Sequence, residues 1–122
     1  MFTKENILKL GRRMGLDIRR YKPRTSPQAQ LVNALSLCDA NLVFDVGANQ
    51  GQFAAEIRNH GYSGQIVSFE PLSAAREMLL ERAKSDCGWF VHDRCAIGAK
   101  DGDVVMNISG NSVSSSALRM LE

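Results

Sequence analysis

The segment 42–53, LVFDVGANQGQF, constrains the fold more than any other part of this chain. It begins as an apolar run that includes Asp45, continues through small residues and two glycines, and then resumes an apolar pattern at Phe53. Because glycine has no Cβ, Gly47 and Gly51 can adopt positive φ and let a ligand approach the backbone. A helix that starts after such a turn directs unpaired N–H groups toward it. The pattern predicts a strand, a tight turn and a helix, an arrangement typical of a nucleotide-type cofactor site.

A second apolar run at 65–69 ends on Glu70, which precedes Pro71. If this strand lies beside the first, Glu70 and Asp45 meet at one edge of the sheet, where Glu70 can accept hydrogen bonds from both hydroxyls of a ribose. Either segment alone is a weak signal. Together they predict a cofactor that contains a ribose.

The remaining pattern predicts an α/β fold with a doubly wound parallel sheet, because strands alternate with segments of helical length. The first strand, 42–46, is almost continuously apolar, as expected for a strand covered on both faces. The inward residues expected on the helices are Leu31, Ala34, Leu35 and Cys38, then Phe53, Ala54 and Ile57, then Ala75, Met78, Leu79 and Ala83. The predicted elements are a helix capped by Thr3 and ending near Met14 before Gly15, a linker at 21–27, helices at 28–38, 51–59 and 73–85, strands at 42–46, 65–69 and 89–91, a hairpin strand at 104–108 and a polar loop at 109–116.

Composition sets the class of protein. The chain has 122 residues and is 44% hydrophobic, which suffices for one domain with a sizeable core. No apolar stretch approaches the roughly 20 residues of a membrane span, and the N-terminus lacks a secretory signal, so we expect a cytoplasmic protein. The three cysteines are Cys38, Cys87 and Cys95. Their number and spacing predict packed, reduced thiols and neither a disulfide framework nor a zinc cluster.

Charge is divided unevenly along the chain. Residues 1–24 hold eight Lys and Arg against two acidic residues, a net charge of +6, whereas the rest of the chain is net acidic. This basic arm also carries apolar residues, so it either lies on an anionic membrane surface or a phosphorylated substrate, or packs one apolar stripe on the domain. Nucleic acid is not an expected partner, because Tyr21 is the only aromatic residue near the arginines.

The motif VFDVGANQGQF at 43–53, GYSGQIVSFEP at 61–71 and AIG at 96–98 resemble the N-terminal half of the FkbM-type family of S-adenosylmethionine-dependent methyltransferases. The likeness extends to GLDIRRY at 15–21 and to 111–118. It implies a Rossmann-like methyltransferase fold, S-adenosyl-L-methionine as cofactor, and methylation of a hydroxyl oxygen on a sugar or secondary metabolite. Chains of the family continue through a further strand. The residue pattern gives a basic helix and linker at 1–27, and the resemblance implies that 28–122 is the cofactor-binding half of the domain.

The cofactor has three parts, and each has candidate residues. Glu70 would bind the ribose, and Asp93 with the backbone at Cys95 and Ala96 would meet the adenine. Each acid also has a structural alternative: Asp45 can cap the turn, Glu70 can start the following helix, and Asp93 can form a surface ion pair. The residues expected at the amino acid end are Asp45, Gly47, Ala48, Asn49 and Gly51.

No catalytic residue can be named from the sequence. His60 and His92 are expected to be structural, and Glu77 and Glu81 fall on a solvated face, so no metal site is predicted. A hydroxyl acceptor, either a small molecule or a glycan, is the expected substrate.

Two other functions stay open. A nicotinamide-binding domain also has a glycine turn and an acid after its second strand, but here Asn49 and Gln52 stand where G-x-G-x-x-G requires glycine. A non-catalytic binding module, or a remnant of a longer enzyme, is the alternative from another class. The strand at 42–46 is expected to lack its partner on the far side, so we expect self-association and no methyl transfer by this chain alone.

Overall fold

The computed structural model describes residues 3–16 and 26–108. The strands form one parallel sheet in the order β1-β2-β3, which confirms the α/β class. The predicted polar loop at 109–116 and most of the predicted linker lie outside the described residues. The elements are α1 (Lys4–Arg13), α2 (Pro27–Leu37), β1 (Leu42–Val46), α3 (Gln52–Asn59), β2 (Gln65–Phe69), α4 (Ser73–Ala83) and β3 (Trp89–Val91).

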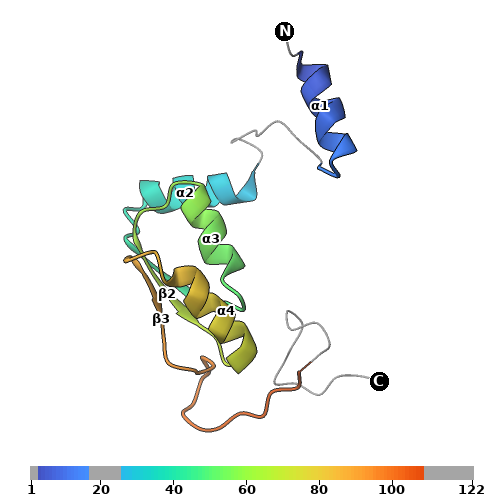
Figure 1. The fold of residues 1–122 in the computed structure, drawn as a ribbon. Helices are drawn as coiled ribbons and strands as arrows, with labels where there is room; N and C mark the ends of the chain where they lie inside the picture. The colour runs from blue at the N-terminus through green and yellow to red at the C-terminus, as the bar shows by residue number, and fades with distance from the viewer. Residues whose placement is uncertain (1–2, 17–25, 109–122) are drawn as a thin grey trace.

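A helix connects each strand to the next, and both connections step in the same direction across the sheet. Crossovers between parallel strands are right-handed, so two successive steps in one direction place both helices on the same face. Figure 1 shows α3 and α4 on one side of the strands. The two helices therefore support one face of the sheet, next to the edge where the strands end.

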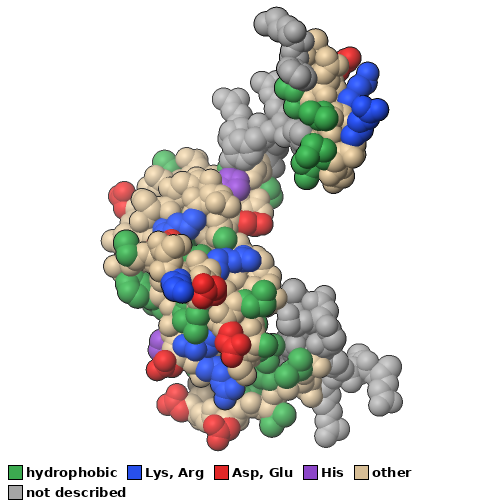
Figure 2. Space-filling view, viewed as in Figure 1, with side chains coloured by type: hydrophobic (Ala, Val, Ile, Leu, Met, Phe, Trp, Pro, Cys, Tyr) green, Lys and Arg blue, Asp and Glu red, His purple; other side chains and the backbone are tan. Residues whose placement is uncertain are grey.

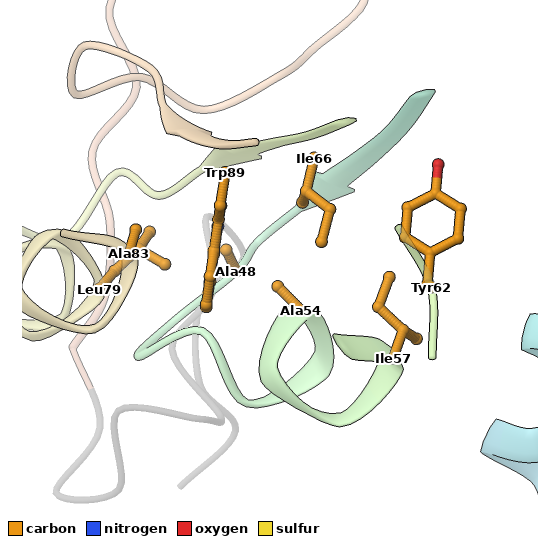
Figure 3. Close-up of a cluster of buried hydrophobic side chains, with 8 residues drawn as sticks. All are labelled: Ala48, Ala54, Ile57, Tyr62, Ile66, Leu79, Ala83 and Trp89. Atoms are coloured by element: carbon orange, nitrogen blue, oxygen red, sulfur yellow. The ribbon is translucent and has the colours of Figure 1, made fainter. Parts of the chain in front are cut away.

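The core lies between this face and the two helices. The register pairs Val43 with Ile66 and Ile66 with Trp89, so alternate residues of the three strands point to the helices. Figure 3 shows side chains from α3, α4 and the strands converging there. The buried hydrophobic cluster consists of Ala48, Ala54, Ile57, Tyr62, Ile66, Leu79, Ala83 and Trp89.

The opposite face of the sheet is apolar and exposed. Leu42, Phe44 and Val46 of β1 are 43%, 64% and 57% exposed, and Phe90 of β3 is 51% exposed. The expectation that β1 is covered on both faces is therefore wrong for the part of the chain that the structure describes. The reason is that both crossovers run in the same direction, so neither α3 nor α4 covers this face.

The helix boundaries follow their capping residues. Thr3 caps α1 by accepting from the Asn6 N–H, and Gly15 follows it with φ of +74°, so both predicted ends of α1 are confirmed. Ser26 caps α2 and Pro27 is its first residue, so the predicted linker is wrong at its last residue. Proline suits this position because its missing N–H would have no partner in the first turn.

Several predicted inward residues and cysteines are exposed. Val32 and Leu35 of α2 pack against the core, so the predicted stripe is confirmed at Leu35. It is wrong at Leu31, Ala34 and Cys38, which are exposed. Phe53 and Met78 are 38% and 52% exposed, although their neighbours are buried. The prediction of packed thiols fails because Cys38 and Cys87 are exposed and Cys95 is half-buried. The exposed Phe53 and Met78 show that a short helix on one face of three strands buries a narrower stripe than the pattern suggests.

The predicted strand at 104–108 is also wrong, because only Asn107 forms an isolated bridge there. An alternating pattern fixes which residues share a face, but a ladder also needs a partner strand. The helices of residues 3–16 and 26–108 all lack the length and apolar character needed to span a membrane.

Arg58, near the end of α3, forms hydrogen bonds to the loops that precede β2 and β3. Its Nε donates to Asp86 Oδ2 at 2.7 Å, and its Nη1 donates to the carbonyl oxygens of Tyr62 and Gly64 at 2.8 and 2.6 Å. The hydrogen bond from Arg58 lowers the pKa of Asp86 below its ordinary value. This network holds the amino edge of the sheet, opposite the edge where Asp45 and Glu70 lie.

Candidate functional site

Two buried carboxylates meet at the carboxyl edge of the sheet. β1 and β2 run in register, with Val46 beside Phe69 and Asp45 beside Ser68. Glu70 follows directly after β2. Asp45 is 7% and Glu70 is 4% exposed, which is rare for acidic residues unless they are paired or functional. The structure thus brings together the two acids that the sequence placed at this edge.

Glu70 holds the glycine turn in place. Its Oε2 accepts from the backbone N–H of Asn49 at 2.7 Å, and its Oε1 accepts from the backbone N–H of Leu72 at 2.8 Å. These short distances are typical of charge-assisted hydrogen bonds. A carboxylate has about four acceptor positions, so two remain for a ligand. Glu70 is therefore a positioning residue. Its bond to the Leu72 N–H at the start of α4 agrees with the structural alternative, and its two unused acceptor positions are those that a ribose would need.

Asp45 takes part in a different hydrogen-bond chain. The indole Nε1–H of Trp89 donates to Ser68 Oγ at 2.9 Å, and the Ser68 hydroxyl donates to Asp45 Oδ2 at 3.2 Å. Burial raises the pKa of Asp45, the Ser68 hydrogen bond opposes this rise, and the charge of nearby Glu70 adds to it. Asp45 thus accepts its hydrogen bond from Ser68 on the neighbouring strand, whereas Glu70 accepts one from Asn49 in the turn.

The turn itself is left-handed at three positions. The φ angles of Gly47, Asn49 and Gly51 are +74°, +50° and +83°. The N–H groups of Gly47 and Ala48 both donate to the carbonyl oxygen of Phe69 at 3.0 Å, and the N–H of Gly51 donates to the carbonyl oxygen of Ala48 at 2.8 Å. The turn N–H groups that were expected to bind a ligand thus have protein acceptors. α3 begins without a side-chain cap, so its first-turn N–H groups are the ones left for an anionic group.

The two glycines serve different purposes. A Cβ on Gly51 would lie 2.8 Å from Leu79 Cδ1 and 2.8 Å from Trp89 Cζ2, both in buried side chains. Glycine is required there for the packing of α3. A Cβ on Gly47 would meet no atom within 4 Å. Gly47 is therefore the position where a ligand can come close to the backbone.

Asn49 contributes a buried atom without a partner. Its Oδ1 accepts no hydrogen bond from the residues that the structure describes and is shielded from water. A buried acceptor without a donor costs free energy, about 1–3 kcal/mol. A ligand with an N–H group in the turn would remove this cost if the Asn49 side chain rotated to bring Oδ1 to the ligand.

A cleft lies beyond the ends of β2 and β3, on the side where adenine was expected. It has a volume of about 550 Å³, and its walls include Pro71 and Leu72 after β2, Arg94, Cys95 and Ala96 after β3, and Met106. Ala96, one of the residues expected at the adenine, lines this cleft. Asp93 is not among the lining residues; its side chain is fully exposed, and its Oδ1 is 3.9 Å from Nη2 of Arg76. The surface ion pair fits Asp93 better than the adenine contact.

The sequence pointed to neither Ser68 nor Trp89 as part of the site. Ser68 is a polar residue within the apolar strand β2 and is fully buried, and this break in the apolar pattern is the signal that could have identified it.

His92 Nδ1 lies 3.5 Å from Cys95 Sγ and 3.0 Å from the carbonyl oxygen of Asp93. His60 Nδ1 lies 2.8 Å from the Glu56 carbonyl oxygen, a contact within one helix turn.

Comparison with protein-family models, with curated proteins and with solved structures gave no significant match. The function of the chain is therefore inferred from the geometry of this edge together with the sequence resemblance.

Proposed function

We propose that the edge formed by Asp45, the turn at 47–51 and Glu70 binds S-adenosylmethionine, and that the protein is a methyltransferase acting on a hydroxyl oxygen of a sugar or secondary metabolite. The observation that supports this most is the pair of buried carboxylates at the ends of adjacent parallel strands, set around a left-handed turn. In open α/β sheets, ligands bind outside the carboxyl ends of the strands.

Charge distinguishes this cofactor from a dinucleotide. Asp45 and Glu70 both present negative charge next to the turn, so a diphosphate placed there would be repelled. S-adenosylmethionine instead carries an ammonium and a sulfonium group, and either would be attracted. Oδ1 of Asn49 has no partner among the described residues, and a rotation of this side chain toward the ligand would let it accept from the ammonium. The residues present therefore fit this cofactor.

The environment of Asp45 gives further support. Burial raises its pKa, which means that the folded chain disfavours the ionised form. A cationic group bound beside Asp45 would stabilise the carboxylate and reverse this effect. Titratable side chains whose pKa is perturbed by burial occur often at functional sites.

The chain's own residues then have separate roles. Asp45 and Asn49 would hold the amino acid end, and the free acceptor positions of Glu70 would hold the ribose hydroxyls. The apolar wall near Leu72 and Ala96 would take the adenine. When bound, the cofactor supplies a methyl group made electrophilic by the sulfonium. Alignment of that group with an acceptor oxygen in a dry site accounts for much of the rate of such a transfer.

Isothermal titration calorimetry with S-adenosylhomocysteine and with NAD tests the proposal. We expect the first to bind and the second to give no heat of binding. Asp45→Asn should weaken S-adenosylhomocysteine at least about tenfold, because a hydrogen bond to a charged group contributes about 1.5–3 kcal/mol. Glu77→Gln, an exposed carboxylate on α4, is the matched control and should bind like the unchanged chain. Binding of NAD without S-adenosylhomocysteine would contradict the proposal.

Transfer itself is tested with radiolabelled S-adenosylmethionine and hydroxylated acceptors, both sugars and secondary metabolites. Label found on a nitrogen or carbon acceptor, and not on oxygen, would contradict the proposed acceptor class while leaving cofactor binding intact.

A further inference from the structure

α1 has two chemically distinct sides. Ile7, Leu10 and Met14 follow one another at spacings of three and four, which places them on one side of a helix with 3.6 residues per turn. Lys9 and Arg12 fall on the opposite side, and Arg13 flanks the apolar side next to Leu10. Figure 2 shows hydrophobic side chains along one side of this helix and Lys and Arg side chains along the other.

The apolar side of α1 is open to solvent in this structure. Ile7, Leu10 and Met14 are 48%, 53% and 69% exposed, and Leu16 just after the helix is 54% exposed. Figure 1 shows α1 set apart from the sheet and its helices. A helix of a globular domain normally buries such a stripe against its core. The stripe therefore needs a partner other than the core described above.

We propose that α1 is an interfacial helix that docks on an anionic lipid surface. At such a surface, apolar side chains reach the acyl chains while lysine and arginine remain at the level of the negatively charged headgroups. Both sides of α1 are then satisfied at once. A nucleic acid would engage only the basic side and leave the apolar stripe in water, and no described residue of α1 is aromatic.

The charge on α1 matches this partner. Lys9, Arg12 and Arg13 are opposed by Glu5 alone in the described side chains of the helix, and Glu5 lies in the first turn, where the helix dipole favours it. The helix has ten residues and only a few apolar side chains, so apolar burial alone would hold it weakly. Its binding must therefore depend on anionic lipid and fall as salt rises. The proposal does not depend on the cofactor site, because α1 contributes no residue to it.

Sedimentation of the full chain with vesicles tests the proposal. We expect binding to vesicles of phosphatidylcholine mixed with phosphatidylserine, and little binding to phosphatidylcholine alone. The double variant Arg12→Ala, Arg13→Ala should bind about thirtyfold more weakly, since each basic residue near an anionic surface contributes about a factor of five. The matched control Arg82→Ala, Lys100→Ala removes the same charge from exposed positions elsewhere and should bind normally.

A second variant separates docking on lipid from packing within the protein. Leu10→Asn should weaken vesicle binding and leave the melting temperature unchanged. A lower melting temperature with unchanged vesicle binding would overturn the proposal, because it would show that the stripe packs on the domain. Equal loss of binding in both double variants, or tighter binding to an RNA of mixed sequence than to anionic vesicles, would also overturn it.

Discussion

Replacing Glu70 removes the group that fixes the glycine turn. Its two carboxylate oxygens accept from the N–H groups of Asn49 and Leu72 at 2.7 and 2.8 Å. Each N–H left without an acceptor costs about 1–3 kcal/mol when buried. Because Asn49 and Leu72 are only partly buried, water can replace part of each bond. We therefore expect Glu70→Ala to lower the free energy of unfolding by about 2–3 kcal/mol.

Urea unfolding followed by circular dichroism measures this loss. Glu70→Gln keeps one acceptor oxygen but turns an amide N–H toward the second backbone donor, so its loss should be about 1–2 kcal/mol. Glu77→Ala and Glu77→Gln on the exposed side of α4 are the matched controls and should change stability by less than about 0.5 kcal/mol. If Glu70→Ala is as stable as Glu77→Ala, the positioning role of Glu70 is refuted, and the carboxylate would have only a ligand role.

Four further changes test other parts of the structure. Asp45→Asn should raise the melting temperature at neutral pH. Because burial raises the pKa of Asp45 above its ordinary 3.8, this gain in melting temperature should grow as pH rises from 3.8 through the raised pKa. A gain that is the same at every pH between 3 and 8 would contradict this prediction. Gly51→Ala should cost about 2–5 kcal/mol in urea unfolding, from positive φ and the clash with buried side chains, whereas Gly47→Ala should cost only about 1–2 kcal/mol; equal losses would refute the distinction. Arg58→Ala should lower the free energy of unfolding by about 2–4 kcal/mol at neutral pH. The loss should be smaller below pH 3.8, because protonation of Asp86 weakens the Arg58–Asp86 ion pair in the unchanged chain. A loss that does not vary with pH would show that this ion pair does not stabilise the fold. Phe44 is 64% exposed on β1, so we expect the chain to self-associate in analytical ultracentrifugation and Phe44→Glu to reduce that association. Association unchanged by the substitution would show that the open sheet face is not the contact.

The sequence predicted the parts of the fold that depend on neighbouring residues. The strand, turn and helix at 42–59 follow from an apolar run, glycines at positive φ and helical apolar spacing, all of which depend on residues close together in the sequence. The positions of Asp45 and Glu70 at one edge follow from the parallel order of β1 and β2. Thr3 and Gly15 mark the ends of α1 for the same local reason.

What the sequence could not predict depends on contacts between distant segments. The apolar pattern of β1 is the same whether one or both of its faces are covered, so the exposure of Phe44 depends on the direction of the crossovers. The pattern also could not show that Glu70 accepts a hydrogen bond from Asn49, 21 residues earlier. Nor could it show that Trp89 donates to Ser68 and Ser68 to Asp45. Asp93 was assigned to the adenine by its place after β3, but its side chain is turned to solvent near Arg76.

The central claim is that the edge around Asp45, the glycine turn and Glu70 binds S-adenosylmethionine. Two-dimensional amide NMR of the isotopically labelled chain, titrated separately with S-adenosylmethionine and with NAD, tests it most directly. The account predicts that S-adenosylmethionine shifts the resonances of Gly47, Asn49 and Ala96 in a saturable manner, while NAD leaves them unchanged. Saturable shifts at these amides with NAD and none with S-adenosylmethionine would contradict it.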